Sequence, residues 1–181
     1  EVTAEVTPHH LMLTADLLVD YDPTFKVNPP LRPKEDIEAL REALADGTID
    51  VVATDHAPHA RHDKEHAFVD AAFGMLGLET AVPVISDLMV ATGRMSWAEV
   101  AKVMSVNPAR IAGMDDHGRA LAVGDPAHIT LIDPSAEVTV DRDESVSLSR
   151  NNPWHGRTFK GGVAATVYAG RVTYRDGVVS E

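Results

Sequence analysis

The chain has 181 residues, of which 44% are hydrophobic, 28 are acidic and 16 are basic, so its formal net charge is -12. Such a chain can bury a hydrophobic core, and its negative charge repels nucleic-acid phosphates and anionic membrane surfaces. No apolar stretch reaches the roughly 20 residues that span a bilayer. The absence of cysteine excludes thiolate chemistry and is compatible with a reducing cytoplasm. We therefore expect a cytoplasmic protein without nucleic-acid or membrane partners.

The first half of the sequence predicts a strand, a helix and a second strand. Residues 1–7 alternate β-branched with polar or small side chains, which favours a strand. A proline-rich, stiff loop follows at 21–33. From Lys34 the apolar residues have helical spacing, and Gly47 is placed to end the helix. The apolar run 49–54 comes directly afterwards and is typical of a parallel strand buried on both faces.

The second half predicts helices and then strands. The polar segment 55–70 is long enough to be a functional loop. Helices are expected at 76–89 and 97–104, the second capped by Ser96, and Asn107-Pro108 either breaks that helix or starts a short one. After Gly113 the pattern predicts strands at 127–132, 138–140 and 163–174. The sequence thus divides into 1–113 and a small β-domain segment, 114–181.

Polar side chains gather directly after the second predicted strand. Asp55 follows the apolar run at the carboxyl end of a parallel strand, where α/β folds place catalytic residues. A lone Asp there is more often a turn or N-cap residue. His56 and His59, with Pro58 between them, add two imidazoles beside the carboxylate. This set of side chains suits metal binding, proton transfer or anion recognition.

Other candidate residues are ambiguous by themselves. Asn28 precedes two prolines, and is either a turn residue or an amide that reads the N–H and C=O of a cyclic amide. Gly74, next to Phe73, either permits a turn or lets backbone groups approach a flat ring. His9 and His10 end the first strand, where at most one can face the pocket; one hydrogen-bonded in a loop and the other solvated is an equal alternative. The remaining histidines are expected to be solvated or without a visible partner: His62, His66, His117, His128 and His155.

Four segments in order resemble the successive motifs of type I bacterial dihydroorotases, in the amidohydrolase superfamily. They are 5–11 (EVTPHHL), 26–32 (KVNPPLR), 53–59 (ATDHAPH) and 73–80 (FGMLGLET), and the closing segment with Asn151-Asn152-Pro153 and 161–170 is also similar. The resemblance implies that 1–113 is the C-terminal part of a (β/α)8 metal-dependent hydrolase barrel, with 1–7 and 49–54 as its last two strands. Two strands cannot close a barrel of eight. We therefore expect a fragment, or a chain that needs a complement.

The resemblance also implies a reaction and roles for individual residues. The reaction is the reversible interconversion of N-carbamoyl-L-aspartate and (S)-dihydroorotate in de novo pyrimidine biosynthesis, at a centre with two Zn²⁺ ions. Asp55 matches a metal ligand and the general base and acid, and Asn28, His59, Phe73 and Gly74 match substrate-binding residues. The family's other metal ligands and its carboxylate-binding arginine are expected upstream of Glu1. The isolated chain should therefore be inactive and poorly stable, with apolar strand faces exposed.

Two alternatives stay open. A hydantoinase, dihydropyrimidinase or allantoinase shares the chemistry but binds other rings, and Asn28 and His59 argue against it. A non-catalytic dihydroorotase-like partner of aspartate transcarbamoylase would need neither Asp55 nor His59, so their presence argues against that reading as well. Either a homo-oligomer or a complex with aspartate transcarbamoylase is compatible with the resemblance.

Overall fold

Two separate stretches of the chain make up each of its two structural units. The structure, a computed structural model, describes residues 2–180. The first unit combines the residues up to Ala81 with Thr139–Thr158, and the second combines Val82–Val138 with the residues from Phe159 onward. This grouping by contacts differs from the sequence division at residue 113, which stays a prediction about domain organisation.

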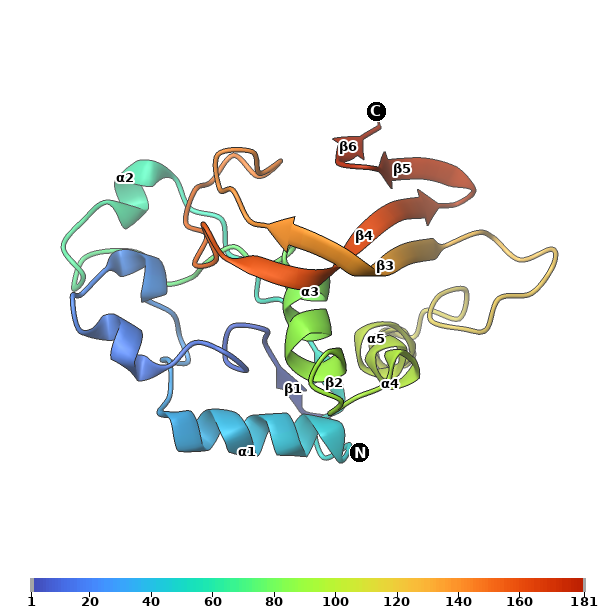
Figure 1. The fold of residues 1–181 in the computed structure, drawn as a ribbon, viewed down its shortest axis with the longest axis horizontal. Helices are drawn as coiled ribbons and strands as arrows, with labels where there is room; N and C mark the ends of the chain where they lie inside the picture. Colours follow the sequence, from blue (N-terminus) through green and yellow to red (C-terminus); the bar gives the residue numbers. More distant parts are fainter. Residues whose placement is uncertain (1, 181) are drawn as a thin grey trace. The chain divides into compact units, whose positions relative to one another are not determined.

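The first unit contains the predicted strand, helix and strand (Figure 1). Strands β1 (Glu5–Val6) and β2 (Val51–Val52) are parallel, with Glu5 opposite Val51 and Val6 opposite Val52. Both are shorter than predicted, because each has a single neighbour in its two-stranded sheet. Helix α1 (Lys34–Ala45) begins where expected and stops before Gly47, whose φ of +85° favours glycine.

Apolar side chains of these three elements contribute to the core of the first unit. Ile37 and Leu44 lie on one face of α1 and are buried, as are Val6, Val51 and Val52 of the strands. The predicted exposure of apolar strand faces is therefore wrong for these valines. The loops of this unit carry only short helical turns, namely η1 (Ala15–Leu18), η2 (Pro23–Phe25) and α2 (Arg61–Lys64), with a cis peptide bond at Asn28-Pro29.

The helical part that follows begins later than predicted. Helix α3 (Ala81–Ile85) continues into the π-helical segment η3 (Ser86–Val90), while residues 76–80 are not helical. Helix α4 (Trp97–Ala101) has Ser96 as its N-cap in a capping box with Glu99, as expected. It continues through the π-helical η4 (Lys102–Val106) into α5 (Asn107–Ala112), so Asn107 starts a further short helix.

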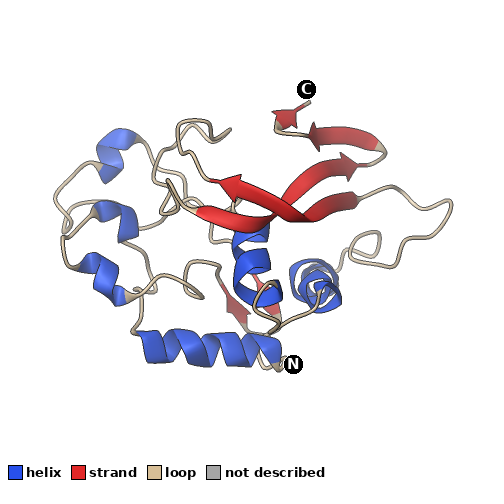
Figure 2. Cartoon of the chain, in the orientation of Figure 1, coloured by secondary structure: helices blue, strands red, loops and turns tan. Residues whose placement is uncertain are grey.

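A four-stranded sheet completes the second unit, in the order β3-β4-β5-β6 (Figure 2). The strands are β3 (Ile129–Thr139), β4 (Thr158–Tyr168), β5 (Arg171–Arg175) and β6 (Val178–Val179). The strands predicted at 127–132 and 138–140 are one continuous strand, and 163–174 is a hairpin with a turn at Ala169-Gly170. The unit's helices lie on one face of the sheet, where a side chain at Gly161 would overlap Ser86. None of the described helices is long and apolar enough to cross a bilayer.

Candidate functional site

Asp55 lies beyond the carboxyl end of β2, at the same edge of the sheet as the segment that follows β1. Its side chain is exposed, and its backbone is in the left-handed region with a φ of +47°. A non-glycine residue in this conformation is uncommon, and such positions concentrate at functional sites. Tyr21, Ala169 and Asp176 also have a positive φ, so this conformation alone does not assign a function, and the role of Asp55 stays a prediction from its strand position.

The two histidines after Asp55 face different partners. Nδ1 of His56 accepts hydrogen bonds from the backbone N–H groups of Gly77 and Leu78, each at 3.2 Å. The ring proton of neutral His56 is consequently on Nε2, so His56 fixes a turn and offers no lone pair to a metal. Nε2 of His59 donates to the carbonyl oxygen of Phe73 at 2.7 Å, which leaves Nδ1 of His59 for a ligand.

Three of the predicted substrate-binding residues lie together. His59 bonds Phe73, and a Cβ added at Gly74 would lie 3.1 Å from Nε2 of His59. The Gly74 N–H donates to the carbonyl of Lys26 at 2.9 Å, which brings the Asn28 loop next to this group. Asn28 is exposed. No direct bond joins Asp55 to the other predicted site residues in the part of the chain that is described.

Two buried lysines, which the sequence reading did not single out, hold the segment that contains Phe73 and Gly74. Nζ of Lys26 donates to the carbonyls of Val69 (2.9 Å) and Ala71 (2.7 Å). Nζ of Lys64 donates to the carbonyls of Ala72 and Gly74, both at 2.9 Å. Burial, followed by the nearby charge of Lys26, lowers the pKa of Lys64 to about 8, while the carboxylate of Asp22 acts in the opposite direction.

Asn151 connects the closing segment to the same place. Its Nδ2 donates to the carbonyls of Ala57 (2.9 Å) and Gly74 (3.1 Å). Its Oδ1 is buried without a hydrogen-bond partner, and a buried acceptor left unpaired is costly. The sequence marked 151–153 only as similar to a family segment, and the structure places Asn151 against the Asp55 loop.

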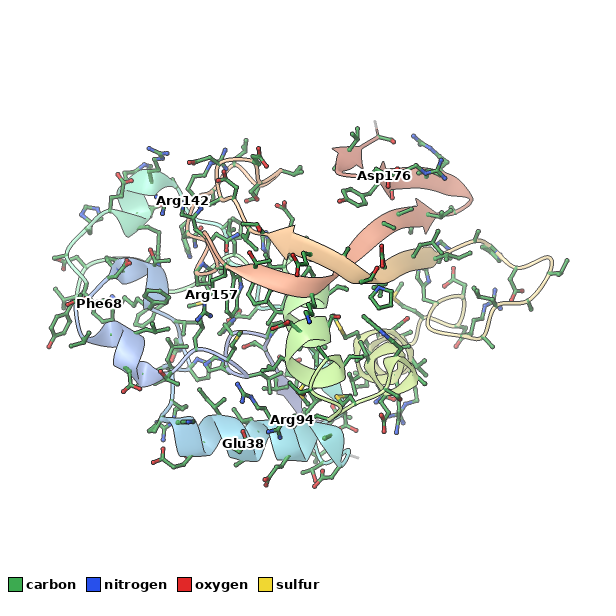
Figure 3. All side chains as sticks on the ribbon, viewed as in Figure 1. Glu38, Phe68, Arg94, Arg142, Arg157 and Asp176 are labelled. Carbon is green, nitrogen blue, oxygen red and sulfur yellow. The ribbon has the colours of Figure 1, made fainter. Side chains whose placement is uncertain are left out.

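A cavity of about 290 Å³ opens beside His59 within the first unit. Most of the charged side chains that line this cavity are basic, although the chain as a whole has a formal net charge of -12. Arg142, labelled in Figure 3, lies in the 139–158 stretch of this unit. The cavity's basic lining is formed by His59, Arg61, Lys64, His66, Arg142 and Arg150, with Asp22 and Glu65 as its acidic members. Such a lining attracts small anions.

His9 and His10 are both buried, so the alternative with one solvated histidine is wrong. Nε2 of His10 donates to the carbonyl of Pro29 at 2.8 Å, and its Nδ1 lies 2.7 Å from the hydroxyl of Thr7. His10 thereby ties the end of β1 to the loop of Asn28. Nε2 of His9 is buried without a hydrogen-bond partner. Burial, followed by the nearby His10, lowers the pKa of His9 from 6.5 to about 3.

The lowered pKa of His9 predicts a pH-dependent stability. Unfolding returns the pKa to 6.5, so between pH 6.5 and 3 the unfolded chain binds one more proton and stability falls as pH falls. From pH 7 to pH 5 this group should account for a loss of about 2 kcal/mol. Urea unfolding of full-length protein at both pH values should show a smaller loss for His9→Gln than for wild type. The exposed His62, changed to Gln, is the control, and equal losses for His9→Gln and wild type would contradict the assignment.

The second unit contains the one cluster of potential metal ligands found among the described residues. It consists of Asp116, His117 and His128. Nδ1 of His117 donates to Asp116 at 2.7 Å, the Ala169 N–H donates to Nδ1 of His128 at 3.3 Å, and the two rings stack at 4.2 Å. Lone pairs lie in the ring planes, so stacked imidazoles do not direct them at one ion. The sequence expectation that these histidines lack partners is nevertheless wrong.

A parallel strand pair followed by a carboxylate and histidines is an arrangement found in (β/α)8 barrels, where polar residues gather at the carboxyl ends of the strands. The chain belongs to the amidohydrolase family, whose model matches residues 11–173. Among solved structures, the L-hydantoinase (dihydropyrimidinase) from Arthrobacter aurescens is 33% identical with a TM-score of 0.92, over 99% of this chain and 41% of that one. The dihydropyrimidinase from Brevibacillus agri is 25% identical with a TM-score of 0.90, over 98% and 40%. These likenesses confirm the predicted fold class, part of a (β/α)8 hydrolase barrel with a small β-domain.

Curated relatives confirm the resemblance to dihydroorotases. The dihydroorotase of Streptomyces coelicolor is 52% identical over 177 residues, which are 98% of this chain and 41% of that protein. The dihydroorotase of Mycobacterium leprae is 54% identical over 174 residues, or 96% of this chain and 40% of that protein. The chain thus spans about 41% of the length of the curated relatives that it matches.

Proposed function

We propose that this chain is part of a dihydroorotase, which interconverts N-carbamoyl-L-aspartate and (S)-dihydroorotate. The observation that carries the proposal is the contact of His59 with Phe73, beside a cavity lined by basic side chains. A ring that bears a carboxylate fits such a site better than a neutral ring. The identity of about half of all positions with dihydroorotases supports the same choice.

Asp55 is the residue to which we assign proton transfer. Its carboxylate accepts the proton of the attacking water as the new C–O bond forms at the ring carbonyl carbon. It then delivers that proton to the ring nitrogen as the C–N bond breaks, so that this nitrogen leaves as the neutral NH2 of the carbamoyl group. In the reverse direction the same carboxylate takes the proton from the attacking carbamoyl nitrogen. The exposed position of Asp55 beyond β2 leaves it open to a substrate.

This chain supplies one of the several side chains needed to bind the metal cofactor of the family. Asp55 offers one exposed carboxylate, an oxygen ligand that zinc accepts, and His56 is turned away from metal binding by its bonds to Gly77 and Leu78. We therefore propose Zn²⁺, two ions per complete site, with Asp55 as this chain's ligand and the other ligands outside the present sequence. When bound, zinc lowers the pKa of water and polarises the ring carbonyl.

Substrate binding is assigned to groups that remain free of internal bonds. The N–H of Gly74 is bonded to Lys26, and its carbonyl accepts from Lys64 and Asn151. The backbone groups of Gly74 are therefore not available to the substrate, and we assign to Gly74 only that its missing side chain lets the ring approach closely. The neighbouring N–H of Phe73 is the backbone donor that we assign to the substrate ring. We assign Nδ1 of His59 to the substrate carboxylate and the exposed amide of Asn28 to the ring.

A substrate panel tests the proposal against the other cyclic amidohydrolases. We expect full-length protein to act on dihydroorotate with a kcat/KM at least about 100-fold above those for hydantoin and allantoin, because only dihydroorotate carries the carboxylate. The comparison with hydantoin is necessary because the solved structures similar to this chain include hydantoinases. Removing the metal with a chelator should abolish turnover, and adding Zn²⁺ should restore it. A preference for hydantoin, or the absence of activity on all three rings, would refute the proposal.

A further inference from the structure

The segment 69–74 is held by an unusual set of donors. Most carbonyls in loops bind water or backbone N–H groups. Here four carbonyls in six residues accept hydrogen bonds from just two ammonium groups, those of Lys26 and Lys64. Both lysines are only 7% exposed, although lysine is seldom buried, and the carboxylate of Asp22 interacts electrostatically with Lys64. Two buried cations in one small region call for a reason beyond packing.

The bonds of the two lysines divide the segment between them. Lys26 holds its beginning through Val69 and Ala71, and its ammonium also lies 4.5 Å from the ring centroid of Phe73. Lys64 holds its end through Ala72 and Gly74. Phe73, which we assign to the substrate, lies between these anchors, with a side chain that is 57% exposed. The two lysines therefore fix the backbone of the segment, while the side chain of Phe73 stays accessible to a ligand.

Local geometry makes the position of Phe73 sensitive to these anchors. The ring of Phe68, labelled in Figure 3, also lies 5.5 Å from the ammonium of Lys26, so both aromatic residues of the loop contact this cation. The carbonyl of Phe73 bonds His59, so a shift of the segment also moves the imidazole assigned to the carboxylate. A shift of the segment therefore weakens the contacts assigned to substrate binding, an effect that raises KM.

We infer that Lys26 and Lys64 are positioning residues, which fix the Phe73-Gly74 segment and His59 in the geometry that binds the substrate. The inference rests on the proposed function, since it takes these residues as substrate contacts. Neither lysine is assigned a contact with the reacting atoms, although Lys64 also lines the cavity beside His59. Their effect should appear mainly in substrate binding, as a raised KM with a smaller change in kcat.

The test replaces each lysine by methionine in the full-length protein, with Lys34→Met as the control. Lys34 is an exposed lysine of the same unit, at the start of α1. We expect Lys26→Met and Lys64→Met to raise the KM for dihydroorotate at least about tenfold, and Lys34→Met to leave it unchanged. Hydrogen exchange of a peptide covering 69–75 should speed up in both variants, while a peptide covering 84–89 stays as in wild type. Folded variants with wild-type KM and wild-type exchange would overturn the inference.

If Lys64→Met does not fold, a second variant, Lys64→Gln, still tests the inference. Lys64→Gln keeps a neutral donor at the same position, and the inference expects a raised KM for it, whereas a wild-type KM would overturn the inference. Wild-type turnover of dihydroorotate is measured first. Its absence refutes the proposed function, while wild-type turnover together with unaffected lysine variants refutes only the role of the lysines.

Discussion

Asp55→Asn in the full-length protein is expected to lower kcat for dihydroorotate by about 1000-fold or more. General acid–base catalysis contributes about 10² to 10⁴-fold to a rate, and loss of a carboxylate ligand also weakens the metal site. Asparagine is suited to isolating this effect, because it tolerates the left-handed backbone that Asp55 adopts at a φ of +47°. The fold should therefore survive while the proton acceptor is lost.

Steady-state kinetics in both directions and the metal content of the purified protein measure the effect of Asp55→Asn. The forward and reverse rates should fall together, because the same carboxylate carries the proton each way. Asp70→Asn is the control, since Asp70 is an exposed carboxylate of the same loop. Activity of Asp55→Asn within tenfold of wild type, at normal metal content, would contradict the role in proton transfer.

Local sequence patterns correctly predicted those elements whose start and end depend on residues close by in the sequence. The helix from Lys34 and the cap at Ser96 formed as predicted, because acidic first turns, capping boxes and terminal glycines act within a few residues. The position of Asp55 also followed from sequence, since a short apolar run after a helix predicts a buried parallel strand. Its left-handed backbone had no signal in the sequence.

The features that sequence reasoning missed depend on distant partners. The carbonyls bound by Lys26 are 43 and 45 positions away, so nothing near Lys26 indicates that it is buried. The helix predicted from Leu76 starts at Ala81 instead. His56, 21 and 22 positions upstream, binds the N–H groups of Gly77 and Leu78 outside the helix. Side-chain acceptors of this kind compete with helical hydrogen bonding, and their effect depends on the tertiary fold.

Gly74→Ala is expected to reduce both stability and activity, because the Gly74 position has no room for a side chain. An added Cβ would lie 2.5 Å from Cβ of Ala57 and 3.1 Å from Nε2 of His59, on a backbone with a φ of +122°. Strain at such a φ and overpacking each cost about 1–3 kcal/mol. We expect a loss of about 3 kcal/mol in urea unfolding, together with a raised KM for dihydroorotate, since Ala57 and His59 belong to one loop.

A matched pair of variants separates the two causes of the Gly74→Ala effect. Gly47→Ala places a methyl group on a backbone with a φ of +85° but with nothing within 4 Å, so it should cost only the backbone strain, about 1 kcal/mol. Adding Ala57→Gly to Gly74→Ala removes the nearer Cβ and should recover the overpacking part of the loss, a coupling that a double-mutant cycle measures. Two results would contradict this account: a loss of unfolding free energy for Gly74→Ala no larger than for Gly47→Ala, or no recovery of that free energy when Ala57→Gly is added. Either would show that the close contact between Ala57 and Gly74 does not hold the substrate-binding loop.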